Sequence, residues 1–351
     1  MLPEFVSNER AMMSPDLPLA PSRRRPRPRK GRSSRDLWLA IGLLALFLVG
    51  AGGLIAATGW RETWAQIARL GAPQIAALLA LSLVNYALRG LRWHLLARRL
   101  GLETTLPQGM RHFLGGFAMS VTPGRVGELV RMRWITRETG WSFARSAPLV
   151  LADRASDLAA MALLLGVGVW FAAGALPGAL PVAGLALAAA VLVTRPRLLA
   201  GLARWGYRAT GRFARGFARA RNAALSLERF SHGPLLAAAL ALGAAGWMAE
   251  AFALHLLLSW MNADIGLWTA AAIFLLATLA GGLTGAPGGL GGAEAAMIAL
   301  LALRGVSPDI AVAATAIIRV TTLWFALAIG LVVFPMAERI SLRKTHALED
   351  C

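Results

Sequence analysis

Charged side chains interrupt apolar stretches at a few positions, and these residues are the first candidates for chemistry. Asp153, Arg154 and Asp157 lie within LADRASDLAA, and Arg319 lies within AIIRVTTLWF. Spacings of one, three and four residues put the first three on or near one face of a helix. A charge inside a membrane helix costs about 2.5–3.5 kcal/mol and usually faces a partner or a cavity. The sequence therefore predicts ion pairs or a binding site at these positions.

The sequence leaves the partners of these charges open. Asp153, Arg154 and Asp157 could pair with one another or with Glu128, either to lock two helices together or to take part in transport. Arg319 has no acidic residue within one turn of its own helix. We therefore expect its partner to be Glu294, Glu250 or an anionic substrate.

Two turn motifs combine proline and glycine, TPGRVGELV (Thr122–Val130) and APGGLGGAE (Ala286–Glu294). In the first, Thr122 is suited to cap a helix, Pro123 to begin it and Gly124 to allow close backbone approach. The free N–H groups and positive dipole of such a helix favour a phosphate or carboxylate. The neighbouring Arg125 either adds to this anion site or extends to the membrane surface.

The second motif supplies the equivalent candidates. Pro287 and Gly288 match Pro123 and Gly124, and Glu294 ends the motif. Each motif precedes a segment with one arginine in an apolar stretch, Arg154 in one case and Arg319 in the other. This recurrence predicts an internal repeat, although Gly and Pro are also common in membrane helices.

The composition is that of a polytopic all-α membrane protein. Of 351 residues, 57% are hydrophobic and 15% are charged, and the mean hydropathy is +0.59, whereas soluble domains are nearer ~25% charged. The net charge of +18 comes from clustered Lys and Arg, which in a membrane protein indicates topology rather than nucleic-acid binding. One cysteine, Cys351, excludes a disulfide framework and a thiolate metal site. We expect no cofactor, no metal and no enzymatic centre.

A helix needs roughly 20 apolar residues to cross the hydrocarbon core, and six segments approach or reach that length. Two further segments, 106–137 and 267–303, are each divided by one of the turn motifs into two limbs that are too short to cross. We expect them to form re-entrant hairpins, which gives eight or so segments if the limbs are counted. The six predicted spans are Leu37–Ala57, Ala72–Leu88, Ala147–Phe171, Leu176–Val193, Pro234–Trp260 and Ala311–Phe334.

The predicted repeat units, about 72–171 and 234–334, each consist of a helix, a hairpin and a helix. Three full crossings separate their first helices, and an odd number inverts the second copy. Inverted repeats with broken helices that meet near the midplane are a recurring transporter architecture. We therefore expect the two hairpins to enter the membrane from opposite sides.

Positive charge sets the predicted orientation, with both termini in the cytoplasm. Residues 1–36 are expected to form a disordered basic tail, 37–335 the transmembrane domain and 336–351 a short cytoplasmic tail. Between the halves, segment 195–231 predicts a basic amphipathic helix on the anionic lipid surface. Its arginines recur at steps of four, four, three and four: Arg204, Arg208, Arg212, Arg215 and Arg219.

Taken together, the motifs resemble the lysylphosphatidylglycerol synthase transmembrane-region family of flippase-like membrane proteins. The resemblance covers about residues 37 to 334 and implies a cytoplasmic-membrane protein of bacteria or archaea. In bifunctional members this region translocates an aminoacylated phospholipid, which a separate soluble domain synthesises. That domain has no counterpart here, so no synthase activity is expected. The matching motifs are LRGLRWHLL (88–96), TPGRVGELVRM (122–132), LADRASDL (151–158), APGGLGGAEAAM (286–297) and LLALRGVSPDIAVAATAIIRV (300–320).

The leading hypothesis is a translocase of a phospholipid or polyprenyl-linked lipid with a charged headgroup, with membrane lipids as partners. Two alternatives remain open from the sequence. One is an ion-coupled carrier of a small anion, and the other is a non-transporting scaffold for lipid-modifying enzymes. The sequence also leaves open the lipid, the energy source, the number of spans and whether the chain forms a homo-oligomer.

Overall fold

The structure, a computed structural model, describes residues 60–120, 126–171 and 233–349, together with scattered positions between 181 and 230. The predicted basic tail 1–36 and the first predicted span lie outside the described residues, as do Thr122 to Arg125. The same holds for most of the predicted span 176–193 and for Arg212, Arg215 and Arg219. Arg204 and Arg208 are described and exposed.

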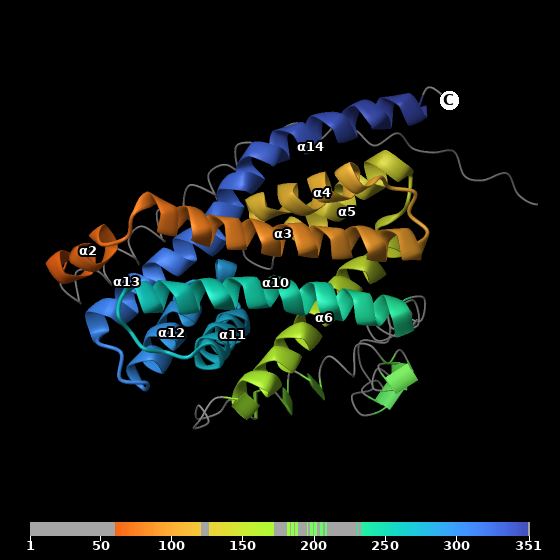
Figure 1. Ribbon diagram of the computed structural model, residues 1–351. Helices are drawn as coiled ribbons and strands as arrows, with labels where there is room; N and C mark the ends of the chain where they lie inside the picture. Colours follow the sequence, from red (N-terminus) through yellow and green to blue (C-terminus); the bar gives the residue numbers. More distant parts are fainter. Residues whose placement is uncertain are drawn as a thin grey trace, which may run out of the picture. The chain divides into compact units, whose positions relative to one another are not determined.

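Every described element is a helix, in agreement with the predicted all-α class (Figure 1). In chain order the α-helices of the first half are α2 (Trp60–Ala68), α3 (Ala72–Leu100), α4 (Leu106–Gly115), α5 (Val126–Thr139) and α6 (Phe143–Phe171). Those of the second half are α10 (Gly233–Trp260), α11 (Leu267–Leu283), α12 (Gly292–Ala302), α13 (Pro308–Arg319) and α14 (Phe325–Glu349). Short helical turns occupy η1 (Gly116–Met119), η4 (Pro287–Gly289) and η5 (Val320–Trp324).

Three described helical stretches are long and apolar enough to cross a membrane: α3, α10 and the continuous stretch Pro308–Arg343. The first of these is longer than the predicted span 72–88, because α3 continues through its basic end to Leu100. It stops at Gly101, whose left-handed backbone (φ 94°) lets its N–H close on the carbonyls of Ala97 and Arg98. The number of spans and the inverted repeat stay predictions.

The last predicted span, 311–334, is part of a longer helical stretch. Helix α13 passes through the π-helical turn η5 into α14, which continues beyond Pro335 to Glu349. The predicted tail 336–351 is therefore helical as far as residue 349, and α14 packs against α4 and α5. Within the π turn, the Thr321 and Thr322 hydroxyls donate to the carbonyls of Ile317 and Ile318.

The core is built around α10, which packs against α3, α6 and α11 (Figure 1). Its side chains and those of α11 form the largest apolar cluster, in which Leu254, Leu257, Ile273 and Leu275 are completely buried. A second cluster lies between α3, α4 and α6 and includes Trp93, Phe113 and Leu149. Burial of this continuous apolar surface holds the helices in register.

Both segments predicted as hairpins contain two helical limbs, and the structure describes the connection between the limbs in the second segment, whereas residues 121–125 of the first lie outside the described residues. In the first, α4 and η1 end at Met119 and α5 begins at Val126. In the second, α11 and α12 pack against each other and η4 lies between them. This second break depends on glycine, because Gly288, Gly289 and Gly291 all have positive φ (62°, 69° and 80°).

Candidate functional site

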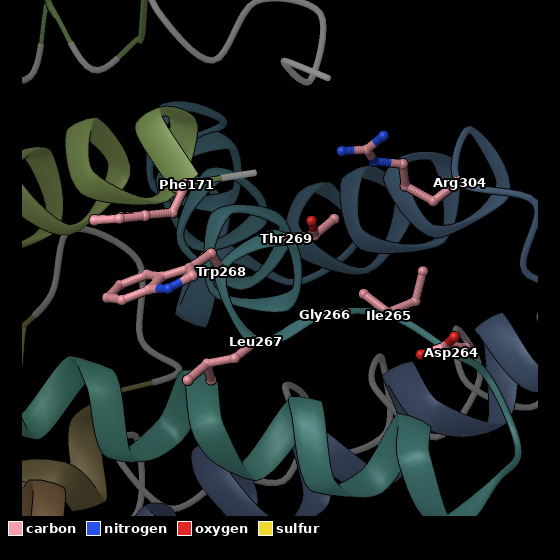
Figure 2. A pocket seen from close by; sticks show the side chains of 8 residues that line it. All are labelled: Phe171, Asp264, Ile265, Gly266, Leu267, Trp268, Thr269 and Arg304. Atoms are coloured by element: carbon pink, nitrogen blue, oxygen red, sulfur yellow. The ribbon is translucent and has the colours of Figure 1, made fainter. Parts of the chain in front are cut away.

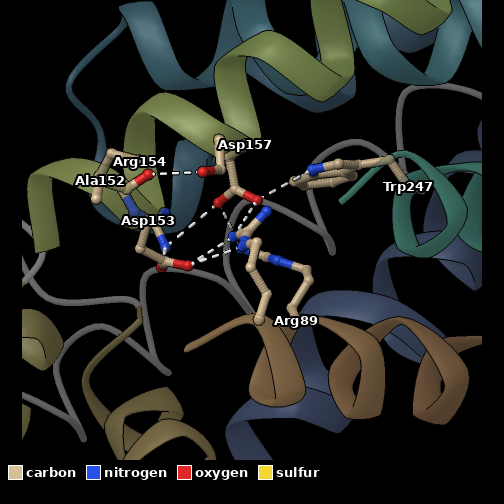
Figure 3. Close-up of polar contacts among 8 residues, drawn as sticks. Arg89, Ala152, Asp153, Arg154, Asp157 and Trp247 are labelled. Carbon is tan, nitrogen blue, oxygen red and sulfur yellow. Dashed lines mark hydrogen bonds and ion pairs between the residues drawn. The ribbon is translucent and has the colours of Figure 1, made fainter. Parts of the chain in front are cut away.

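Five charged residues from α3 and α6 form a buried group that we call the central ion cluster: Arg89, Arg92, Asp153, Arg154 and Asp157 (Figure 3). At its centre, Nη2 of Arg92 lies 2.7 Å from an oxygen of Asp153 and 2.7 Å from an oxygen of Asp157. Nε of Arg92 also donates to Asp153, at 3.1 Å. The Arg92 side chain is 0% exposed, so this arginine joins the two helices in the protein interior.

Arg89 extends the central ion cluster toward α10. Its Nη2 donates to the second oxygen of Asp157 at 2.8 Å, and its guanidinium lies 4.8 Å from the ring centroid of Trp247. The indole Nε1 of Trp247 donates to Asp157 at 3.2 Å (Figure 3). Asp157 therefore holds donors from both α3 and α10, which fixes the packing of three helices at one residue.

Arg154 closes the cluster on its outer side. Its Nη2 lies 2.8 Å from Asp153 and 3.3 Å from Asp157. Its side chain is 30% exposed, whereas the other four members lie between 0% and 12%. Arg154 is therefore the member that a ligand can reach most easily.

The spacing of the residues accounts for this arrangement. Asp153 and Asp157 are four residues apart on α6, and Arg89 and Arg92 are three apart on α3, so each pair lies on one helix face. Asp157 is the central residue of the 29-residue helix α6, roughly 20 Å from either end at about 1.5 Å per residue. Ion pairs in such surroundings are weakly screened and hold their partners in fixed geometry.

Close helix approach also depends on Gly243 of α10. A Cβ at this position would lie 2.8 Å from Nη1 of Arg92 and 3.1 Å from the Cβ of Ala160. Glycine thus leaves room for the guanidinium between α10 and α6. The packing of α10 over the central ion cluster therefore depends on a glycine at position 243.

Arg319 makes a second polar contact, at the break between α11 and α12. Its Nε donates to Glu294 at 2.6 Å and its Nη2 donates to the carbonyl oxygen of Gly288 at 2.9 Å. Of the partners considered from the sequence, Glu294 is the one that it contacts. The pair is largely buried, with side-chain exposures of 12% and 16%, and it ties the end of α13 to the helix break.

The predicted site residues fall into these two groups. Asp153, Arg154 and Asp157 belong to the central ion cluster, whereas Gly288, Glu294 and Arg319 meet at the second break, where Pro287 begins η4. Glu128 lies on α5, but its side chain is outside the described part of the structure. Thr122, Pro123, Gly124 and Arg125 are also outside the described residues, so their role as an anion site stays a prediction.

Sequence reasoning missed Arg89, Arg92 and Trp247. The sequence analysis ended the predicted span at Leu88 and singled out neither arginine, whereas the structure divides the arginines of α3 into two groups. Arg98 and Arg99 are exposed at the end of α3, whereas Arg89 and Arg92 face α6. The pairing of α3 with α6 could have been inferred from one feature of the sequence: two arginines three residues apart on one helix match two aspartates four residues apart on another.

Two further carboxylates join neighbouring helices, Glu138 between α4 and α5 and Glu338 between α5 and α14. Glu138 of α5 accepts from Arg111 and Gln108 of α4, and Nε2 of His112 lies 3.2 Å away. Burial alone would raise the pKa of Glu138, but the hydrogen bond and charge of His112, with help from Arg111 and Gln108, hold it below its ordinary value.

Glu338 of α14 accepts from three donors of α5, and this contact holds the last helix against α5. The indole of Trp134 donates at 2.8 Å, Arg133 at 2.6 Å and Arg137 at 2.7 Å. These three contacts join α5 to α14.

A surface pocket of about 350 Å³ lies at the end of α6 and the start of α11 (Figure 2). The rings of Phe171 and Trp268 stack on one of its walls, with centroids 5.4 Å apart. Asp264 and Arg304 contribute its charged groups. No member of the central ion cluster lines it, so the pocket and the polar centre are separate features. In the part of the chain that the structure describes, no three His, Cys, Asp or Glu side chains gather into a metal site.

Comparison with known proteins agrees with this membrane architecture. The family model described as the lysylphosphatidylglycerol synthase transmembrane region matches residues 37–330. A protein of Methanothermobacter thermautotrophicus (strain Delta H) described as a UPF0104 membrane protein is 36% identical over 89 residues. This match covers 25% of the present chain and 26% of that relative, so it spans only about a quarter of either protein. The chain belongs to the lysylphosphatidylglycerol synthase transmembrane-region family and is an integral membrane protein of a prokaryotic membrane family.

Proposed function

We propose that the protein is a translocase, without enzymatic activity, that moves a phospholipid or polyprenyl-linked lipid with a charged headgroup between leaflets of the cytoplasmic membrane. The observation that carries this proposal is the central ion cluster, five charged residues midway along packed apolar helices. Ionisable residues at such depth commonly mark the path of a polar substrate. The family membership is consistent with this reading.

The two parts of the central ion cluster have different roles in this proposal. Arg92 and Asp153, with exposures of 0% and 1%, form an ion pair that we call the structural lock, because it holds α3 against α6. Arg154, at 30%, is the contact for a headgroup phosphate, because a guanidinium can exchange a carboxylate oxygen for a phosphate oxygen with the same geometry. The lock keeps the helices together while the outer arginine changes partner.

The breaks in the two helical segments give the headgroup a polar route. Backbone that is not helical at membrane depth is tolerated where it is buried in protein or lines a wet cavity. The Arg319–Glu294 pair holds the second break, and the predicted turn 122–125 forms the tip of the first. In this proposal six full spans and an inverted repeat place the breaks on opposite sides of the membrane, with both termini in the cytoplasm.

The basic segment 195–231 is proposed to lie on the anionic lipid surface, where each arginine contributes about 1 kcal/mol. The exposed positions of Arg204 and Arg208 are compatible with this role. Binding there would orient the two halves of the transmembrane domain relative to the membrane plane.

Reconstitution into lipid vesicles tests the proposal. Fluorescent anionic phospholipids, zwitterionic phospholipids and polyprenyl phosphates are placed in one leaflet, and their exchange is followed by quenching from outside. We expect exchange of at least one charged lipid well above that in protein-free vesicles. Failure to accelerate any of them would refute the proposal. Uptake of a small anion under a pH gradient, with no lipid exchange, would instead favour the anion carrier.

A further inference from the structure

Glu250 lies on the face of α10 that covers the polar centre of the bundle. It follows Gly243, Gly246 and Trp247 at spacings of seven, four and three, which puts all four on one helix face. Trp247 contacts Asp157, and a Cβ on Gly246 would lie 2.7 Å from the Asn85 side-chain oxygen. Glu250 itself is 5% exposed.

The contacts of Glu250 differ from those of the other buried carboxylates. Asp153, Asp157, Glu138 and Glu294 each lie within 3 Å of an arginine nitrogen. In the described part of the chain, Glu250 forms no ion pair. Asn85 packs against Gly246, one turn before Glu250, and in the described part of the chain neither polar atom of its amide has a hydrogen-bond partner.

Charged and titratable groups nevertheless surround Glu250 on the elements that pack against α10. Helix α10 packs against α3, α6 and α13, which carry Arg89 and Tyr86, Asp157 and Arg319, respectively. A Cβ on Gly246, one turn before Glu250, would lie 3.6 Å from the Cγ of Arg89, and the charges of Arg89, Arg319 and Asp157 act on Glu250. Both arginines are already engaged, Arg89 by Asp157 and Arg319 by Glu294. Glu250 therefore lies within electrostatic reach of both polar groups without being bound to either.

An isolated buried carboxylate is unfavourable unless it is paired or takes up a proton. In the arrangement observed, a protonated Glu250 leaves both arginines to their partners. When its O–H bond breaks and the proton passes to water, the carboxylate gains a negative charge. It then competes with Asp157 for Arg89 and with Glu294 for Arg319. Loss of one proton from Glu250 therefore weakens both the Arg89–Asp157 pair and the Arg319–Glu294 pair.

We propose that Glu250 is a proton-binding site that couples lipid translocation to proton movement across the membrane. The coupling rests on the proposed lipid translocation, whereas the proton site itself does not. Loss of the proton would loosen the second helix break and release Arg89 from Asp157, and uptake of the proton would restore both contacts. A proton gradient could then drive exchange in one direction.

Infrared difference spectroscopy of the full-length protein in lipid tests the proton site without any transport assay. We expect a band of a protonated carboxyl group that is lost as the pH is raised. The band should be absent from Glu250→Gln and retained in Glu103→Gln, a matched control in which an exposed carboxyl group is removed. Glu250→Asp should shift the band, which keeps the test valid if the glutamine variant folds poorly. An identical difference spectrum for wild type and Glu250→Gln would overturn the site.

Lipid exchange in vesicles at different internal and external pH tests the coupling. We expect the wild-type rate of lipid exchange to change by roughly tenfold per pH unit over the pH range in which the required form of Glu250 is the minor one, as for one essential titrating group. Glu250→Gln should still exchange lipid but without pH dependence. Equal pH dependence in both proteins would overturn the coupling. A titrating Glu250 in a protein that exchanges no lipid would refute the translocase proposal alone.

Discussion

Replacing Arg92 with leucine should destabilise the protein far more than replacing Arg154, although both residues pair with the same two aspartates. Arg92 is 0% exposed and donates to Asp153 at 3.1 and 2.7 Å and to Asp157 at 2.7 Å. Removing one partner of a buried ion pair costs about 3–5 kcal/mol, because it leaves an uncompensated charge. Leucine supplies no donor to either carboxylate.

The remaining contacts set where in this range the loss should fall. Without Arg92, Asp157 keeps Arg89 at 2.8 Å, Trp247 at 3.2 Å and Arg154 at 3.3 Å, whereas among the described residues Asp153 keeps Arg154 alone, at 2.8 Å. We therefore expect a loss near the lower end, about 3 kcal/mol. Arg154→Leu leaves both aspartates bound to Arg92 and removes a 30% exposed side chain, so about 1 kcal/mol or less is expected.

Reversible unfolding in mixed detergent micelles, followed by tryptophan fluorescence and circular dichroism, measures these differences. The double variant Arg92→Leu/Asp153→Leu removes both a charge and its counter-charge. It should recover part of the loss through a coupling energy of about 0.5–3 kcal/mol. Equal losses for the two single arginine variants, or strictly additive losses in the double variant, would refute the assignment of Arg92 as the buried lock.

Three further predictions concern other parts of the bundle. Gly243→Ala should lower the free energy of unfolding by about 1–3 kcal/mol, because its Cβ would press on the fixed guanidinium of Arg92; Gly166→Ala, with nothing within 4 Å, is the control and should not destabilise. Arg319→Gln should increase amide hydrogen exchange across residues 281–292, because the donor to the Gly288 carbonyl oxygen is lost, and unchanged protection would contradict this role. Because the pKa of Glu138 is lowered in the folded state, its contribution to stability is present above the ordinary glutamate value of about 4.3 and is lost as the pH falls through the folded pKa. Unfolding titrations should therefore show the gap between wild type and Glu138→Gln narrowing below about pH 4, and a gap that widens there would contradict the assignment.

The helical class, the break between α11 and α12 and the candidate charges on α6 and α13 could be predicted from the sequence. Proline and glycine clusters in apolar stretches mark helix breaks directly, because glycine adopts the positive φ found at Gly288 and Gly289 without a steric penalty. The absence of a nearby acid on its own helix also restricted Arg319 to a few distant partners, of which Glu294 is one.

The pairing of α3 with α6 could not be predicted in this way. Arg89 and Arg92 follow an apolar run and precede Arg98 and Arg99, so rules that count basic residues treat all four alike. Only the packed structure brings Asp153 and Asp157, more than 60 residues away, onto the facing helix. The length of the last helix was also underestimated. Helix α14 continues through Pro335, and Glu338 holds this continuation against α5.

The most direct test of the account is the rate at which an anionic lipid exchanges between the leaflets of protein-containing vesicles. The proteins to compare are wild type, Arg154→Gln and Arg154→Lys. The control is Arg98→Gln, which alters an exposed arginine at the end of α3. A hydrogen bond to a charged group contributes about 1.5–3 kcal/mol, so Arg154→Gln should slow exchange roughly 10- to 100-fold. Lysine should retain part of the rate, and Arg98→Gln should match wild type. Exchange by Arg154→Gln at the wild-type rate would contradict the claim that the outer arginine of the central ion cluster contacts the lipid headgroup.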